Sequence, residues 1–489
     1  MLSFSTRAAR RLVPACVLSA AAVAALAGPG VASANDRLLC KEGTKINGEG
    51  STLQETAMKK VWGEVSPKAY NAIGQTNPKA CPGGPEVTYN TKGKTGSGAG
   101  MENWYVHEEY GPEAQGFVGT DNAPNEGIKE KIEKENGGTG GKLLTIPTLQ
   151  AAVAIIVHLP TGCTAEAAPG TKPLATLNRL VLTQKTLEKI ERRVITKWNS
   201  IKEAKDKLVG AKCTTAQKNS AITRIVREDG SGTTATFKKW LELVNSKGET
   251  AGGKVCDAAG ETWLQCGEEP PANTKWPEEG VDLKRGHGSG GVVEKVEETP
   301  GSIGYVVLAN ARKGGKAASF VPPLGGEGKE EFWVELENGQ KEEVGGKKLT
   351  VYTDPSTNGP EAKKDRSNCE ETGYVAIVPK TGKAEAGKFP PSSTEKLWNL
   401  VSAEKKQVNY SLCGFTYDLS LTKYKGYKGA TLEEATTAGD FLEFVLNTAP
   451  EGGQKLIEEE TDYLGLPTNP EPKKNVLKIA QEGAEKIEF

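Results

Sequence analysis

A run of eight residues, REDGSGTT at 227–234, most constrains what this chain can fold into. It begins at the carboxyl end of a short apolar segment, ITRIVRE at 222–228, and precedes ATFKKWLELV. The large apolar side chains of this second segment recur at helical spacing: Phe237, Trp240, Leu241 and Val244. The pattern predicts a buried strand, a tight turn and an amphipathic helix capped by Asp229 or Ser231. Free N–H groups at such a helix start, beside a guanidinium and hydroxyls, can hold a tetrahedral oxyanion. The alternative is an ordinary capped surface helix.

The same order of strand, glycine turn and helix start recurs elsewhere. INGEGSTLQETAMKKVWGEV at 46–65 predicts a strand and a helix capped by Ser51 or Thr52. EVTYN at 86–90 leads to GSGAGMENW, where Ser97 begins a helix, and GFVGTDNAP at 116–124 predicts a strand that presents Thr120 and Asp121 at its carboxyl end. GHGSGGVVEKV at 286–296 is a further glycine-rich turn into a helix.

Strands therefore alternate with helices, which predicts an α/β fold with largely parallel sheets. In such sheets, ligands bind beyond the carboxyl ends of the strands, where these turns lie. The longest apolar run after residue 34, at 143–160, is interpreted as two buried strands divided at Pro147. We expect His158 at its end to be a structural residue.

The first 34 residues have the pattern of a secretory signal peptide. Three arginines precede an apolar run at 12–26, and Ala32-Ser33-Ala34 fits a cleavage site. Loss of the three arginines changes the formal net charge from −1 to −4, so nothing indicates binding to nucleic acid. After cleavage near Ala34, the predicted product is exported and soluble, and it lies either in the periplasm or in the extracellular space or cell envelope.

Eight cysteines remain after removal of Cys16, and an even number in an exported chain favours disulfides. Their spacing suggests pairing in sequential order, most simply Cys256 with Cys266, although the sequence leaves the connectivity open. The three histidines are far apart, so we expect neither a zinc site nor a cofactor.

In their order along the chain, these motifs resemble the phosphate-binding proteins of the ABC-type phosphate transport system. The resemblance covers essentially the whole mature chain, through GEGSTL, GSGAG, GTD, REDGSGTT, GSIGY and DYLGLP. It implies a two-lobed periplasmic-binding-protein fold with hinge strands. Lobe I would comprise 35–158 and 415–489, and lobe II 159–414, with insertions at about 246–280 and 312–395.

The resemblance also implies a set of phosphate-binding residues: Thr52, Leu53, Ser97, Asp121, Arg227, Ser231, Gly232 and Thr233. Arg227 would grip two phosphate oxygens, and Asp229 would orient it. Asp121 would accept a hydrogen bond from a protonated phosphate oxygen and so disfavour sulfate, which has no such proton near neutral pH. Asn122 follows Asp121 as an apparent insertion, and which of the two faces the anion stays open.

The predicted function is that of a monomeric solute-binding protein that captures inorganic phosphate between two lobes and delivers it to a membrane ABC permease. A secreted phosphatase with Ser97, Ser231 or Thr233 as nucleophile is one alternative. No histidine or metal cluster lies close in the sequence to activate these hydroxyls, which favours a protein that is not an enzyme. Another alternative is a surface-interaction protein whose insertions bind partners and whose cleft is vestigial.

Overall fold

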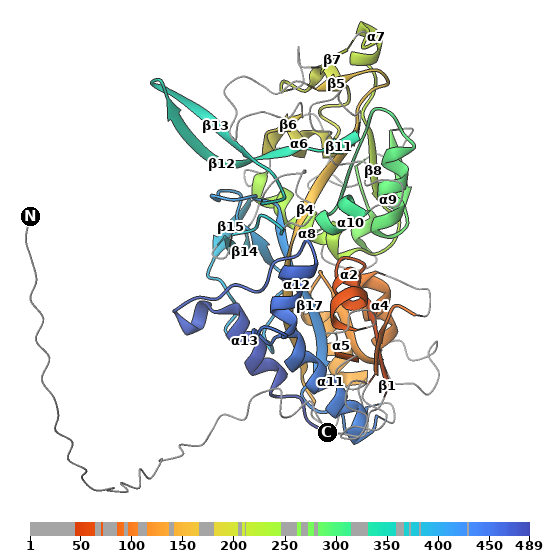
Figure 1. The fold of residues 1–489 in the computed structure, drawn as a ribbon, viewed down its shortest axis with the longest axis vertical. Coiled ribbons are helices and arrows are strands. Elements are labelled where there is room, and N and C mark those ends of the chain that lie inside the picture. Colours follow the sequence, from red (N-terminus) through yellow and green to blue (C-terminus); the bar gives the residue numbers. More distant parts are fainter. Residues whose placement is uncertain are drawn as a thin grey trace, which may run out of the picture.

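The computed structural model describes the following residues: 45–63, 70–71, 86–91, 96–105, 115–135, 141–165, 180–203, 208–210, 212–245, 262–265, 272–277, 282–313, 331–357, 366–370, 373–380, 383–427 and 430–489. The predicted signal peptide lies outside them. Figure 1 shows an elongated molecule in which helices flank a long, curled central sheet. The structure confirms the predicted α/β class with a two-lobed architecture.

The central sheet has nine strands, with the order β2-β1-β3-β17-β4-β10-β8-β9 and β11 also paired with β4. The first half of the sheet contains β2 (Glu86–Tyr89), β1 (Lys45–Gly50), β3 (Gln115–Thr120) and β17 (Cys413–Leu421). The second half contains β10 (Ser302–Val307), β8 (Thr223–Arg227), β9 (Leu283–Gly286) and β11 (Glu331–Trp333). In the first half β1 is parallel to β2 and β3, and in the second β8 is parallel to β9 and β10.

One strand, β4 (Leu143–His158), passes through both halves, and all sixteen of its residues are buried. Its first part pairs antiparallel with β17, and its last part pairs antiparallel with β10 and β11. The prediction of two strands divided at Pro147 is therefore wrong. The ladder continues past the proline through a shift of register, in which Tyr417 faces Pro147 and Thr416 faces Leu149. Such an irregularity accommodates the missing N–H of a proline without ending the strand.

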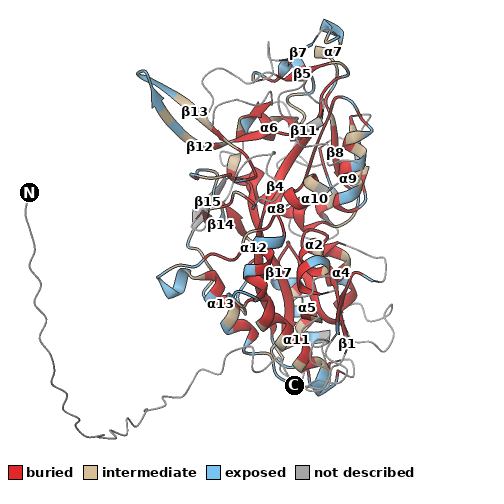
Figure 2. Ribbon diagram, viewed as in Figure 1, coloured by how far each residue is buried: buried red, intermediate tan, exposed pale blue. Residues whose placement is uncertain are grey.

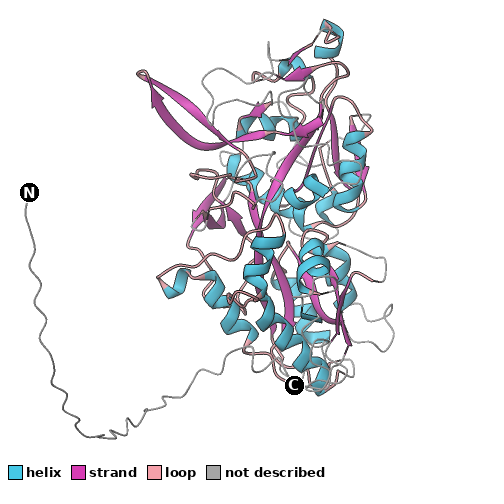
Figure 3. Cartoon of the chain, in the orientation of Figure 1, coloured by secondary structure: helices cyan, strands magenta, loops and turns pink. Residues whose placement is uncertain are grey.

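Helices cover the sheet in both halves (Figure 3). In the first half they are α2 (Glu55–Ala57), the π-helical turn η1 (Met58–Trp62), α4 (Ser97–Tyr105), α5 (Glu126–Glu135), α11 (Leu432–Val445), α12 (Gly453–Glu460), η5 (Pro472–Lys474) and α13 (Val476–Ala484). In the second half they are α6 (Gln184–Glu191), η2 (Trp198–Ser200), α7 (Thr215–Lys218), α8 (Gly232–Val244), η3 (Ala272–Thr274), α9 (Gly288–Glu297) and α10 (Leu308–Lys313). Figure 2 shows that the buried residues concentrate on the central strands and the helix faces against them.

Among the residues described, three small sheets accompany the central sheet. One pairs β5 (Thr164–Ala165) with β7 (Leu208–Val209), and another contains β6 (Val181–Leu182), β12 (Glu335–Val344) and β13 (Lys347–Thr353). A third contains β14 (Tyr374–Lys380), β15 (Lys383–Gly387) and β16 (Val401–Ala403). Two antiparallel hairpins, β12–β13 and β14–β15, lie within residues 335–387, and the first of them projects from the molecule in Figure 1.

Two disulfides follow the predicted sequential order. Cys163 is bonded to Cys213, and Cys369 is bonded to Cys413 at the start of β17. The remaining four cysteines, including the predicted pair Cys256 and Cys266, lie outside the described residues. Within the described part of the chain, no helix has the length and apolar character needed to span a bilayer.

Candidate anion site

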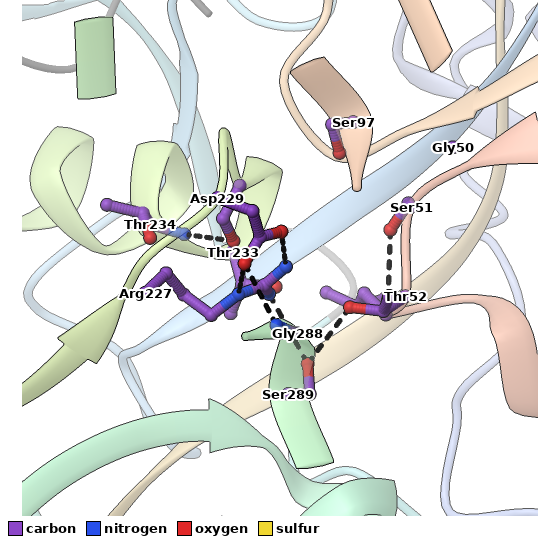
Figure 4. A network of polar contacts seen from close by, with 12 residues as sticks. Gly50, Ser51, Thr52, Ser97, Arg227, Asp229, Thr233, Thr234, Gly288 and Ser289 are labelled. Atoms are coloured by element: carbon purple, nitrogen blue, oxygen red, sulfur yellow. Dashed lines mark hydrogen bonds and ion pairs between the residues drawn. The ribbon is translucent and has the colours of Figure 1, made fainter. Parts of the chain in front are cut away.

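Four strand-to-helix turns meet between the two halves of the sheet. Two come from the first half: the turn after β1 and the turn after β3. The start of α4, also in the first half, joins them. The other two connect β8 to α8 and β9 to α9 in the second half. Figure 4 shows Thr52 of the turn after β1 directed toward Arg227 and Ser289 of the second half. The carboxyl ends of parallel strands thus form the site, as expected for an open α/β sheet.

Asp121, just beyond β3, is the centre of a cluster of hydroxyls. Its carboxylate accepts hydrogen bonds from Ser51 Oγ, from Ser97 Oγ at 3.3 Å, and from Thr233 Oγ1 at 3.0 Å. Burial raises the pKa of Asp121, although these hydroxyls and the charge of Arg227 act in the opposite direction. A buried carboxylate with neutral donors around it can still accept a proton or a hydrogen bond from a ligand.

Arg227 ends β8, and its side chain is 2% exposed. Its guanidinium makes two hydrogen bonds to Asp229, of which Nε to Oδ1 measures 2.8 Å. The backbone N–H of Gly288 also donates to Asp229 Oδ1, at 2.9 Å. Burial alone would raise the pKa of Asp229, but the bond and charge of Arg227 and the Gly288 amide lower it overall. Asp229 therefore orients Arg227, as the resemblance implies.

The start of α8 confirms one of the two predicted caps. Ser231 is the N-cap residue and accepts a hydrogen bond from the Thr234 N–H, whereas Asp229 is engaged with Arg227. The next residue, Gly232, approaches the first half so closely that an added Cβ would lie 2.5 Å from Ser97 Oγ and 2.6 Å from Asp121 Cγ. Only glycine permits this contact between the start of α8 and the residues around Asp121.

Further hydrogen bonds join the two halves directly. The N–H of Gly98 donates to the carbonyl of Gly230 at 3.1 Å, and Thr236 Oγ1 donates to the carbonyl of Asp121 at 3.4 Å. Thr52 Oγ1 lies 3.2 Å from Ser289 Oγ. The two halves are therefore closed upon each other around the site.

Seven of the eight predicted ligands lie with polar groups in or beside this network. They are Thr52, Ser97, Asp121, Arg227, Ser231, Gly232 and Thr233, and all are buried. The eighth, Leu53, has its side chain in the core, and its N–H donates to Ser51 Oγ at 3.0 Å. Its amide is thus at the site but is bonded within its own turn.

The first turn does not cap its helix as predicted. The N-cap of α2 is Gln54, without a capping side-chain bond, so the expectation of Ser51 or Thr52 is wrong. The reason is competition, because the Ser51 hydroxyl is used by Asp121 and by the Leu53 amide. The side chain of Gln54 points instead into the core, where it donates to Asp418 Oδ1 at 2.7 Å.

The structure distinguishes Asp121 from Asn122. The carboxylate of Asp121 receives the three hydroxyls, whereas the backbone N–H of Asn122 donates to Thr120 Oγ1 at 3.1 Å. The Nδ2 of Asn122 is buried and has no hydrogen-bond partner among the residues described. Asp121 is thus the residue that faces the hydroxyl cluster.

Sequence reasoning missed three participants, which are Ser51, Gly288 and Ser289. The local pattern indicates only a helix cap at Ser51 and only a helix start at 286–291. A signal is available, because GHGSGG has the same glycines and hydroxyl as GSGAG and DGSGTT, and it too follows a strand. His158, by contrast, is structural as predicted, with Nδ1 3.1 Å and 3.0 Å from the carbonyl oxygens of Val296 and Glu297.

Comparisons with known proteins agree with this architecture. The phosphate-binding protein of Stenotrophomonas maltophilia matches with a TM-score of 0.55 at 13% identity, over 90% of this chain and 94% of that one. A human phosphate-binding apolipoprotein matches with a TM-score of 0.52 at 17% identity, over 88% and 92% of the two chains. PfluDING, a high-affinity periplasmic phosphate-binding protein bound with phosphate, has a TM-score of 0.51 at 15% identity, over 91% and 99%.

At these identities, the three structures establish a shared fold. No curated protein sequence matches the chain significantly. The family model described as the PBP superfamily domain matches residues 40–448, which is most of the chain. The chain therefore belongs to the PBP superfamily.

Proposed function

We propose that this protein is an exported solute-binding protein that captures inorganic phosphate between its two lobes and delivers it to a membrane ABC permease. The observation that carries the proposal is the pairing of a fixed guanidinium with a buried acceptor. Arg227 is held by Asp229 on one side of the site, and Asp121 lies among three hydroxyls on the other. Such a site offers many donors to an oxyanion and a single carboxylate to a protonated oxygen.

The proposed ligands are those predicted from the sequence, and Ser51 is added as a hydroxyl that holds Asp121. The hydroxyls of Thr52 and Ser231 and the N–H groups at the start of α8 would donate to phosphate oxygens. The hydroxyls of Ser97 and Thr233, which donate to Asp121 in this structure, would turn toward the anion when it binds. The start of a helix favours an anion through its dipole as well as its free N–H groups. We place lobe I at 35–158 and 415–489 and lobe II at 159–414, so that β4 and β17 connect the lobes as hinge strands. Closure about such a hinge would enclose the anion.

Calorimetric titration of ligand-stripped protein at neutral pH tests the proposal. We expect binding of phosphate and of arsenate, which also carries a proton near neutral pH, and little binding of sulfate. Equal affinity for phosphate and sulfate would contradict the role of Asp121, and absence of phosphate binding would contradict the function. A chromogenic phosphate monoester should not be hydrolysed, because we infer that the site binds without turnover.

The structural neighbours whose names state a role are binding proteins and not enzymes. This supports solute binding as the role of the chain. Delivery to a permease is tested separately, by phosphate uptake into cells that lack this protein. Uptake at low external phosphate should fall and should return when the natural chain, but not Arg227→Ala, is supplied.

A further inference from the structure

The turn GHGSGG between β9 and α9 is fixed against the anion site by strand pairing. β9 lies parallel to β8, with Gly286 opposite Arg227, so the start of α9 lies beside the Arg227–Asp229 pair. Gly288 has a φ of +62°, a conformation that glycine adopts without strain. In this conformation its N–H reaches Asp229 Oδ1 at 2.9 Å. The turn thus supports the carboxylate that orients Arg227.

The following residue, Ser289, contacts both halves of the molecule. It is 2% exposed, and its Oγ lies 3.2 Å from Thr52 Oγ1 and 3.5 Å from Arg227 Nη1. A guanidinium can only donate, so Ser289 Oγ is the acceptor for Arg227. Its own hydrogen then remains available for Thr52 Oγ1. The Ser289 hydroxyl therefore links Arg227 in the second half to Thr52 in the turn after β1 in the first half (Figure 4).

We propose that Ser289 is a positioning residue of the anion site, which holds Thr52 and Arg227 in their relative places when the two halves close. This rests on the proposed function, because it concerns the same site. Ser289 acts through Thr52 and Arg227 and not by contact with the anion. Its contribution exists only in the closed arrangement, so it slows the dissociation of bound phosphate without changing its association.

A matched control lies on the neighbouring strand. Ser302 is also fully buried, and its Oγ donates to the carbonyl of Val296 in α9 at 3.3 Å. Its replacement by alanine removes a buried hydroxyl next to the same helix but leaves the link between the halves intact. Ser289→Thr retains the hydroxyl and tests for rescue.

Stopped-flow measurement of phosphate dissociation is the first test. Ser289→Ala should dissociate roughly tenfold faster, with an unchanged association rate and an unchanged preference for phosphate over sulfate. Ser302→Ala should match the natural protein, and Ser289→Thr should restore most of the loss. An equal dissociation rate in Ser289→Ala and Ser302→Ala would overturn the proposal. A changed phosphate preference would also overturn it, because that indicates direct contact with the anion.

A double-mutant cycle with Thr52→Val tests the link itself. Phosphate dissociation rates are compared for the natural protein, the two single variants and the double variant, and the two changes should be coupled by about fivefold, because loss of either hydroxyl already breaks the link in the closed arrangement. Strictly additive effects in a protein that binds phosphate would overturn the positioning role of Ser289 alone. If the natural protein binds no phosphate, the proposed function and the positioning role both fail.

Discussion

Two carboxylates of the anion site, Asp121 in the first half and Asp229 in the second, have opposite electrostatic environments. Asp229 receives a guanidinium and a backbone amide, and its pKa is lowered. Asp121 is hydrogen-bonded by three hydroxyls, and burial raises its pKa. The difference separates two tasks. Asp229 is committed to Arg227, whereas Asp121 keeps the capacity to accept a hydrogen bond from a protonated ligand.

The largest loss of phosphate affinity should follow from removal of Arg227, the cation that is paired with Asp229. Arg227→Ala would delete the two charge-assisted bonds that we propose Arg227 makes to the anion, and it leaves Asp229 buried without its partner. We expect phosphate affinity to fall on the order of a thousandfold, measured by calorimetry. Arg366→Ala is the control, since Arg366 is half-exposed and paired with Glu458 on the surface. An affinity that survives Arg227→Ala would mean that phosphate binds elsewhere and that the site has been misplaced.

The next largest loss of phosphate affinity should follow from a substitution that keeps the two halves of the molecule apart. In Gly232→Ala the added Cβ would meet Ser97 Oγ and Asp121 Cγ at 2.5 and 2.6 Å, so the halves cannot close as far. We expect a loss of up to roughly a hundredfold in phosphate affinity. Gly290→Ala is matched, because it is also in the first turn of a helix at this site but has no atom within 4 Å of the added Cβ. Similar behaviour of the two variants would show that closure does not depend on Gly232.

The sequence could predict the strand-to-helix turns because each carries its signal locally. Glycines and hydroxyl residues between an apolar strand and an amphipathic helix were enough to predict Ser97, Ser231 and Arg227 as candidate site residues. The partners of these residues depend on which strands become neighbours. Ser289 is 62 residues from Arg227 and 237 from Thr52, and only the pairing of β8 with β9 and the closure of the halves bring it to them.

Failures of prediction also arose where tertiary contacts override local preference. Ser51 is a good helix cap in isolation, but its hydroxyl is used by a carboxylate 70 residues away. Pro147 commonly ends a strand, but β17 accommodates it through a shift of register. Neither outcome depends on the residues adjacent in sequence, so local patterns could not reveal them.

The role assigned to Asp121 can be tested by a change of one atom. Asp121→Asn retains the shape of the side chain but replaces one carboxylate oxygen with an amide NH₂ group. This group can donate a hydrogen bond to a fully ionised oxygen of an anion such as sulfate. We expect phosphate affinity to fall roughly tenfold and sulfate affinity to rise, so that the preference between them narrows. Competition titration at neutral pH measures both affinities.

In the natural protein, sulfate binding should strengthen as the pH falls through the raised pKa of Asp121, because the neutral carboxyl no longer repels the anion. The amide introduced by Asp121→Asn cannot titrate, and sulfate binding to this variant should lack that dependence.

A third carboxyl group, that of Asp418 on β17, has a different environment from those of Asp121 and Asp229. It is fully buried, Gln54 Nε2 donates to its Oδ1, and its Oδ2 has no hydrogen-bond partner within the described residues. Burial raises its pKa to about 7 from an ordinary value of 3.8, against the smaller opposing effect of the Gln54 bond. The folded chain therefore holds a proton that the unfolded chain has already released between these two pH values.

Stability should accordingly fall as the pH rises from about 4 to about 7, since the unfolded state binds fewer protons there. In Asp418→Asn this contribution is absent, so urea unfolding should show the variant gaining about 1 kcal/mol relative to the natural protein between pH 5 and pH 6. Any constant cost of the new amide cancels in that difference. Glu191→Gln in the second half should behave alike, because burial also raises the pKa of Glu191 to about 7. A pH-independent difference for Asp418→Asn would mean that Asp418 is ionised in the folded protein, with its charge stabilised beside Gln54 much as Asp229 is stabilised beside Arg227.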